Sequence, residues 1–125
     1  ENHNKEPDLA EIHYIPHNVE ETRWFLDEIK APNFKWAFNV AHGHLVPEGW
    51  SGFLDAFGTD NIGQVRVNDN TGEYEVHLVP GEGTIDFPDL FEKIESGGYT
   101  GWYNLGFGDE ADKIRIRDQF ETLVK

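Results

Sequence analysis

Apolar and polar residues alternate in three short stretches of the chain, and this alternation predicts β-strands. The stretches are residues 34–40 (FKWAFNV), 62–68 (IGQVRVN) and about 102–107 (WYNLGF). Successive side chains of a strand point to opposite faces. Each expected strand therefore has one bulky apolar face and one face of small or polar residues.

Helical periodicity fills the segments between these strands. Asn18, with Glu21 three residues later, predicts a capping box at the start of a helix. The apolar stripe expected for this helix is Thr22, Phe25, Leu26 and Ile29. Further helices are expected near 50–58, after Asp86 and from about 110, with loops at 1–17, 41–50 and 69–85. Alternating strands and helices predict a parallel α/β sheet.

The polar strand faces favour a barrel over an open sheet. They carry Asn39, Arg66 and Asn68, which could not be covered by helices without hydrogen-bonding partners. A doubly wound sheet needs apolar residues on both faces, whereas a barrel lumen at the catalytic end is polar. A complete barrel needs about 250 residues. We therefore predict an α/β fold, half of a (β/α)8 TIM barrel, with parallel strands and covering helices.

Charge and composition exclude several classes of function. The 10 basic and 24 acidic residues give a net charge of −14, which disfavours nucleic-acid and membrane-surface partners. Without cysteine the chain has no disulfide or thiolate chemistry. This composition and the lack of a signal peptide or long apolar run predict a cytoplasmic protein. Because the sequence begins at Glu1 and contains no Met, we expect a fragment, a processed product or an edited chain.

Four strings resemble, in order and spacing, the C-terminal half of the xylose isomerase-like barrel superfamily. They are ENHN at 1–4, NVAH at 39–42, VRVNDN at 65–70 with HLVPGEGTIDF at 77–87, and GYTG at 98–101. That superfamily includes sugar-phosphate isomerases, ketose 3-epimerases and, more distantly, endonuclease IV. PGEGTIDF and GYTG are the most specific strings, and the resemblance covers essentially the whole chain. It implies that residues 1–125 form a single C-terminal half-barrel unit, from the tip of the fifth strand at Glu1 to the eighth helix.

The resemblance implies which positions would bind a divalent metal. The fifth-strand glutamate is Glu1, and the DxxH motif of the sixth strand falls on Asn39 and His42. The seventh-strand histidine falls on Arg66 and the eighth-strand glutamate on Gly106. The epimerase-type quartet of ligands corresponds to positions 1, 39, 66 and 106. Only Glu1 is kept, since an amide, a guanidinium and a glycine are poor ligands for a hard cation. The resemblance thus implies a largely lost metal site.

Roles for individual residues follow from the same resemblance. Glu1 is the candidate catalytic residue, and Asn39, His42 and Arg66 are candidates for binding a sugar or sugar phosphate. A weaker metal site would combine His42 with Glu75 and His77. The cofactor implied is Mn, Mg, Co or Zn, and the alternative is that no metal binds. For Arg66 we favour an ion pair with Glu1 or Glu75 over a contact to a substrate oxyanion.

Two local features have a functional and a structural interpretation. The backbone of the PGEGT segment at 80–84 could bind phosphate, or its glycines could only shape a turn. We favour the turn. His3, His13 and His17 lie in a polar loop, and we expect them to be solvated.

Two classes of function remain open at this point. One is a metal-dependent sugar isomerase or epimerase; the other is a non-catalytic half-barrel fragment or engineered scaffold that self-associates. An apurinic-site nuclease comes third, since the charge and the replaced ligands oppose it. Half a barrel leaves open strand edges, so we expect either a homo-oligomer or a missing N-terminal half.

Overall fold

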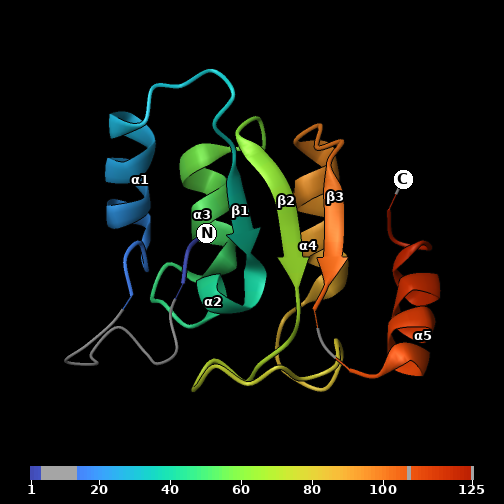
Figure 1. The fold of residues 1–125 in the computed structure, drawn as a ribbon. Coiled ribbons are helices and arrows are strands. Elements are labelled where there is room, and N and C mark those ends of the chain that lie inside the picture. The colour runs from blue at the N-terminus through green and yellow to red at the C-terminus, as the bar shows by residue number, and fades with distance from the viewer. Residues whose placement is uncertain (4–13, 107, 125) are drawn as a thin grey trace.

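A three-stranded parallel sheet lies at the centre of the protein (Figure 1). The computed structural model describes residues 1–3, 14–106 and 108–124. The strands are β1 (Trp36–Asn39), β2 (Ile62–Val67) and β3 (Trp102–Leu105), in the order β1-β2-β3. All pairs are parallel, which confirms the α/β half-barrel prediction, although β1 and β3 are shorter than the alternation indicated.

Helices cover one face and both flanks of this sheet. They are α1 (Val19–Glu28), α2 (Val40–His44), α3 (Gly49–Phe57), α4 (Phe87–Ser96) and α5 (Glu110–Phe120). Helices α3 and α4 lie behind the sheet, while α1 lies beyond β1 and α5 beyond β3 (Figure 1). The short helix α2 was expected to be a loop. It forms because the Asn39 side chain accepts a hydrogen bond from the His42 backbone N–H and caps its first turn.

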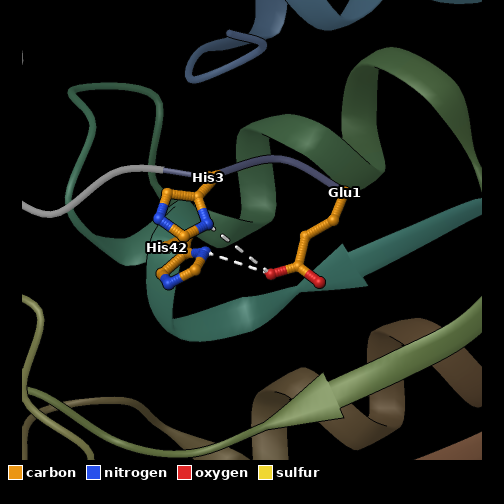
Figure 2. A group of neighbouring side chains, drawn as sticks. All are labelled: Glu1, His3 and His42. Atoms are coloured by element: carbon orange, nitrogen blue, oxygen red, sulfur yellow. Dashed lines mark ion pairs between the residues drawn. The ribbon is translucent and has the colours of Figure 1, made fainter. Parts of the chain in front are cut away.

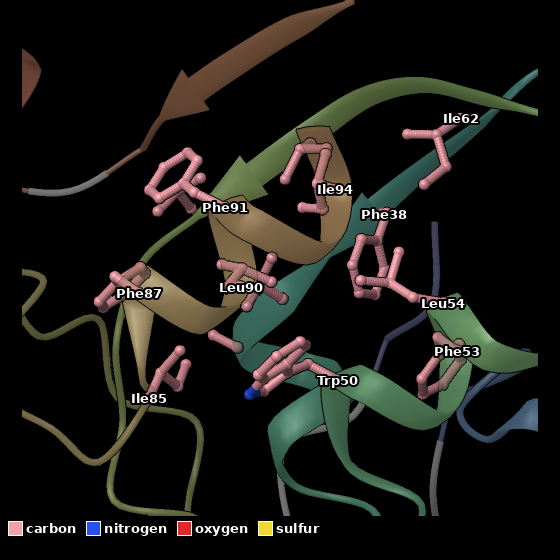
Figure 3. Close-up of a cluster of buried hydrophobic side chains, with 14 of the residues drawn as sticks. Phe38, Trp50, Phe53, Leu54, Ile62, Ile85, Phe87, Leu90, Phe91 and Ile94 are labelled. Carbon is pink, nitrogen blue, oxygen red and sulfur yellow. The ribbon is translucent and has the colours of Figure 1, made fainter. Parts of the chain in front are cut away.

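The apolar faces of the strands form a single core with α3 and α4 (Figure 3). Phe38 of β1 and Val65 of β2 are fully buried, as are Phe53 of α3 and Leu90 of α4. Burying a side chain of this size contributes about 1.5–3 kcal/mol. The core holds the sheet rigidly from one side and leaves the opposite face free to carry polar groups.

The start of α1 departs in one respect from its prediction. The Asn18 Oδ1 accepts from the Glu21 backbone N–H at 2.9 Å, as expected. The Glu21 carboxylate, however, accepts from the backbone N–H of His17 and contacts its Nδ1 at 2.8 Å. His17 is only 3% exposed, so the prediction of a solvated His17 was wrong. An acidic partner on the first turn makes its burial possible. His13 lies outside the described residues.

The polar face of the sheet is arranged in two rows. Cross-strand pairing aligns Ala37 with Gln64 and Trp102, and Asn39 with Arg66 and Asn104. No helix of the described residues covers this face (Figure 1). Trp102 is accordingly 81% exposed.

Candidate functional site

The carboxyl ends of the three strands meet at one end of the sheet, together with residues 1–3 and the loop after β2. Parallel strands bring the residues that follow them to the same edge, which is where barrel enzymes place their active sites. In this protein the edge carries Glu1, Asn39 and His42 next to Arg66. All four residues are candidates that were named from the sequence.

Asn39 joins the chain start to the end of β1. Its backbone N–H donates to Asn2 Oδ1 at 2.8 Å, and its carbonyl accepts from Asn2 Nδ2 at 2.9 Å. Its side-chain Nδ2 donates to Glu1 at 3.1 Å, while its Oδ1 caps α2. Asn39 therefore positions Glu1 and His42. It uses for this the side-chain amide groups that would otherwise be free to bind a substrate. Asn2, fully buried, was not singled out from the sequence.

Glu1 and Arg66 form the ion pair that the sequence favoured. Arg66 Nη1 donates to Glu1 Oε2 at 2.5 Å, and the two side chains are 41% and 21% exposed. Burial raises the pKa of the Glu1 carboxyl, but hydrogen bonds from Arg66 and Asn39 outweigh it, so that the pKa lies below its ordinary value. Glu1 is thus held as a carboxylate, with Arg66 as its counter-charge.

His42 is buried between two oxygen acceptors. Its Nδ1 lies 3.0 Å from the Asn2 carbonyl oxygen, and its Nε2 lies 2.8 Å from Glu75 Oε1. A carbonyl only accepts, so Nδ1 must carry a proton. The contact between Nε2 and Glu75 then requires either a shared proton or a shared cation. A histidine whose second nitrogen is fixed by a carbonyl is the usual arrangement of a metal ligand.

Three of the predicted residues fit a metal in their spacing. Ligand atoms of His42, Glu75 and His77 all lie within 4.8 Å of one another. Glu75 Oε1 is 2.8 Å from His42 Nε2 and 3.6 Å from His77 Nε2. Tetrahedral zinc ligands at about 2.0 Å from the ion lie about 3.3 Å apart, and the two distances bracket that value. This group therefore fits a divalent cation.

A second group of possible ligands fits a metal less well. Glu1 Oε1 lies 3.6 Å from His42 Nδ1 and 3.9 Å from His3 Nδ1 (Figure 2). The His42 Nδ1 is already directed at the Asn2 carbonyl, and the Glu1 carboxylate already binds Arg66. His3 packs on the His42 ring, with centroids 4.3 Å apart. It helps enclose His42, and the expectation that it is simply solvated was wrong.

Asp69 organises the loop that supplies Glu75. Its carboxylate is fully buried and accepts backbone N–H groups of Asn70, Gly81, Gly83 and Ile85. A Cβ on Gly83 would lie 2.3 Å from Asp69 Oδ1, so only glycine fits. The amides that could have bound phosphate therefore bind Asp69, in agreement with the turn interpretation of PGEGT. Asp69 was not singled out from the sequence, because its burial and its backbone partners appear only in the fold.

The comparisons agree with this architecture. A sequence model of the family described as xylose isomerase-like TIM barrel matches residues 1–123, and the chain belongs to that family. An uncharacterised protein of Methanocaldococcus jannaschii is 24% identical over 100 residues, 78% of this chain and 34% of the relative. The crystal structure of a D-tagatose 3-epimerase-like protein superposes with a TM-score of 0.81 at 21% identity, over 95% of this chain and 44% of that one.

The chain thus spans about a third of the curated relative and less than half of the structural neighbour. That coverage, with the three-stranded parallel sheet, confirms the half-barrel architecture. None of the helices in the described parts of the chain is long and apolar enough to cross a membrane.

Proposed function

We propose that this chain forms half of the ligand site of a sugar isomerase- or epimerase-type barrel and holds one divalent cation through His42, Glu75 and His77. The observation that carries the proposal is the placement of His42, whose two ring nitrogens both face oxygen acceptors. A cation shared by Nε2 and Glu75 Oε1 would satisfy this contact in place of a shared proton. When bound, such an ion would polarise a carbonyl or hydroxyl of the substrate.

The chain's own residues would provide orientation and proton transfer. Asn39 fixes Glu1 beside the end of β1, where Glu1 is the proposed proton acceptor. Because its pKa is lowered by Arg66 and Asn39 against the effect of burial, Glu1 is a weaker base than an unpaired carboxylate. We therefore expect slow proton transfer compared with an enzyme that keeps two free carboxylates in this position.

A metal titration tests this proposal directly. Calorimetry with Mn²⁺, Co²⁺ and Zn²⁺ should show one site per chain, lost in His42→Ala and weakened at least about tenfold in Glu75→Gln. Glu73→Gln is the matched control, because Glu73 is an exposed carboxylate of the same loop. Equal binding by Glu75→Gln and Glu73→Gln, or no binding by the native chain, would contradict the proposal.

The Glu1–Arg66 ion pair supports a second candidate function, a non-catalytic half-barrel. The pair is neutral without any ion, and Gly106 provides no side chain at the end of β3. A chain of this kind would contribute structure and leave catalysis elsewhere. Absence of metal binding in the titration, with the fold intact by circular dichroism, would favour this candidate.

We also propose that the open sides of the sheet are covered by an N-terminal half of the same barrel type. Apolar hollows of about 220 and 210 Å³ flank the free edges, one between α1 and β1 and the other between β3 and α5. The Asn2 side chain already pairs with the Asn39 backbone at the β1 edge. The chain covers only 44% of the structural neighbour of the same fold, which favours the missing half of such a barrel over a second copy as the cover.

Sedimentation distinguishes these two occupants. If the N-terminal half is the occupant, the isolated chain should sediment as a monomer at micromolar concentration. Its Trp102 should also stay accessible to a fluorescence quencher, because this side chain is 81% exposed on the open face. A stable dimer in which Trp102 is protected would identify a second copy as the occupant and overturn the proposal.

A further inference from the structure

The proposed cation group is built on two separate pieces of backbone. His42 belongs to α2, whereas Glu75 and His77 belong to the loop between β2 and α4. The affinity of such a group depends on how firmly its ligands are held at the right separation. Residues that orient metal ligands typically contribute a factor of about 10–100 in affinity. The bonds that join α2 to the loop are therefore part of the site.

Two side-chain hydrogen bonds, besides the contact within the cation group itself, join α2 to this loop in the described residues. His44 Nε2 lies 2.8 Å from Thr84 Oγ1 at an exposed position, where water competes for both groups. Asn70 Nδ2 donates to the Ala41 carbonyl oxygen at 2.8 Å. Asn70 is fully buried and Ala41 is 1% exposed, so this second bond is shielded from water and is the stronger link.

The other side-chain group of Asn70 shapes the loop. Its Oδ1 accepts a hydrogen bond from the Gly72 backbone N–H at 2.8 Å, which forms an Asx-type turn at the start of the loop. Gly72 has a φ of +82°, a conformation that favours glycine. Three residues later the chain reaches Glu75, whose Oε1 lies 2.8 Å from His42 Nε2. One amide thus holds the helix of His42 through its donor and the path toward Glu75 through its acceptor.

We propose that Asn70 is the positioning residue of the cation group, which sets the separation of His42 from Glu75 and so determines how tightly a cation is held. The proposal rests on the proposed function, since it concerns the same group. Asn70 is not one of the ligands; it acts through the backbone of Ala41 and Gly72. An amide can serve both ends, whereas a carboxylate cannot donate to a carbonyl and a serine hydroxyl is too short to span both.

The geometry can be tested without metal by NMR of the chelator-treated chain. The native chain should show a nuclear Overhauser cross-peak between the His42 ring and the Glu75 side chain. Asn70→Ser and Asn70→Asp should weaken or lose it, because both remove the donor to Ala41 while keeping an oxygen for the turn. Ile94→Val is the matched control and should keep the cross-peak, because it alters a fully buried residue of α4 and neither of the two elements.

A second signal separates positioning from general unfolding of the loop. The antiparallel bridge of Asp69 with Leu78 closes the loop, and its cross-strand cross-peak should persist in both Asn70 variants. Loss of the His42 signal with this bridge intact is the expected result. Loss of both signals together in both variants would show that Asn70 only stabilises the loop, and would overturn the proposal.

A cobalt titration tests the consequence for the site. Co²⁺ would be titrated into the native chain, Asn70→Ser, Asn70→Asp and Ile94→Val by calorimetry, and the visible absorption of the bound ion would report its coordination geometry. Both Asn70 variants should bind at least about tenfold more weakly and with an altered spectrum, while Ile94→Val should match the native chain. Native-like affinity together with an intact His42 cross-peak in Asn70→Ser would overturn the proposal. A native chain that binds no cobalt would contradict the cation site instead, and the metal-free cross-peak would still decide whether Asn70 sets the contact between His42 and Glu75.

Discussion

Replacing Asp69 with asparagine should be among the most destabilising single substitutions in the loop after β2. The native carboxylate accepts four backbone N–H groups while its side chain is fully buried. Oδ2 alone receives Gly81 and Gly83, each at 2.9 Å. An asparagine side chain has only one carbonyl oxygen, and its amide nitrogen cannot accept a hydrogen bond. Two of the four backbone N–H groups would therefore lose their acceptor.

The magnitude follows from those lost bonds. A hydrogen bond to a charged group contributes about 1.5–3 kcal/mol, so two lost bonds give roughly 3–6 kcal/mol before any relaxation. We expect Asp69→Asn to lower the free energy of unfolding by at least about 2 kcal/mol, because part of the loop can turn toward water. Urea denaturation followed by tryptophan fluorescence measures this change.

Asp118→Asn is the matched control for this measurement. Asp118 is 58% exposed and pairs with Arg117 on the surface of α5, so its substitution should change stability by less than about 0.5 kcal/mol. A change below about 1 kcal/mol in Asp69→Asn would show that the loop does not depend on the carboxylate, since losing one charged bond alone exceeds this value. That result would refute the account of how Glu75 is positioned.

Three further predictions concern single side chains. Gly83→Ala should destabilise the same loop by about 1–3 kcal/mol in urea denaturation, because its Cβ would overlap the Asp69 carboxylate. The folded pKa of Glu1 is lowered from its ordinary value of 4.5, so Glu1 should stabilise the protein at pH values above 4.5 and lose that contribution as the pH falls further. The difference in unfolding free energy between the native protein and Glu1→Gln should therefore shrink between about pH 6 and about pH 3. Burial and Glu95 raise the pKa of Tyr103, so Tyr103→Phe should remove the last tyrosine to ionise in an alkaline absorbance titration; an unchanged final step would contradict the assignment.

The fold could be read from the sequence because it depends on periodicity. Trp36 and Phe38 alternate with Ala37 and Asn39, and the apolar set is buried as this pattern predicts. What the pattern could not give was α2. Its five residues begin directly at the end of β1 and depend on one side chain, Asn39, that serves the site and the helix at once. Local capping of this kind carries no repeat that a periodicity search could detect.

The sequence named candidate residues that the fold brings together, but it did not give their hydrogen bonds. The spacing of His42, Glu75 and His77 along the chain gives no distance, and only the folded loop brings Glu75 within 2.8 Å of His42. That loop is closed by the antiparallel bridge of Asp69 with Leu78. Asn2 and Asp69 were missed because their roles are to satisfy backbone groups, and the partners of a backbone group are set by tertiary structure.

The polar face of the sheet indicates what a covering N-terminal half would have to provide. A lumen that is lined by Arg66 and Asn104 gains little stability from apolar cover. Trp102 in the neighbouring row is highly exposed, and leaving so large an apolar side chain in water is unfavourable. The covering half must therefore bring apolar groups to the Trp102 end and leave the carboxyl ends polar. The closed barrel of this family would meet both requirements, because its lumen is packed below and open to ligands above. We therefore expect Trp102 to become protected from a fluorescence quencher when the N-terminal half is present.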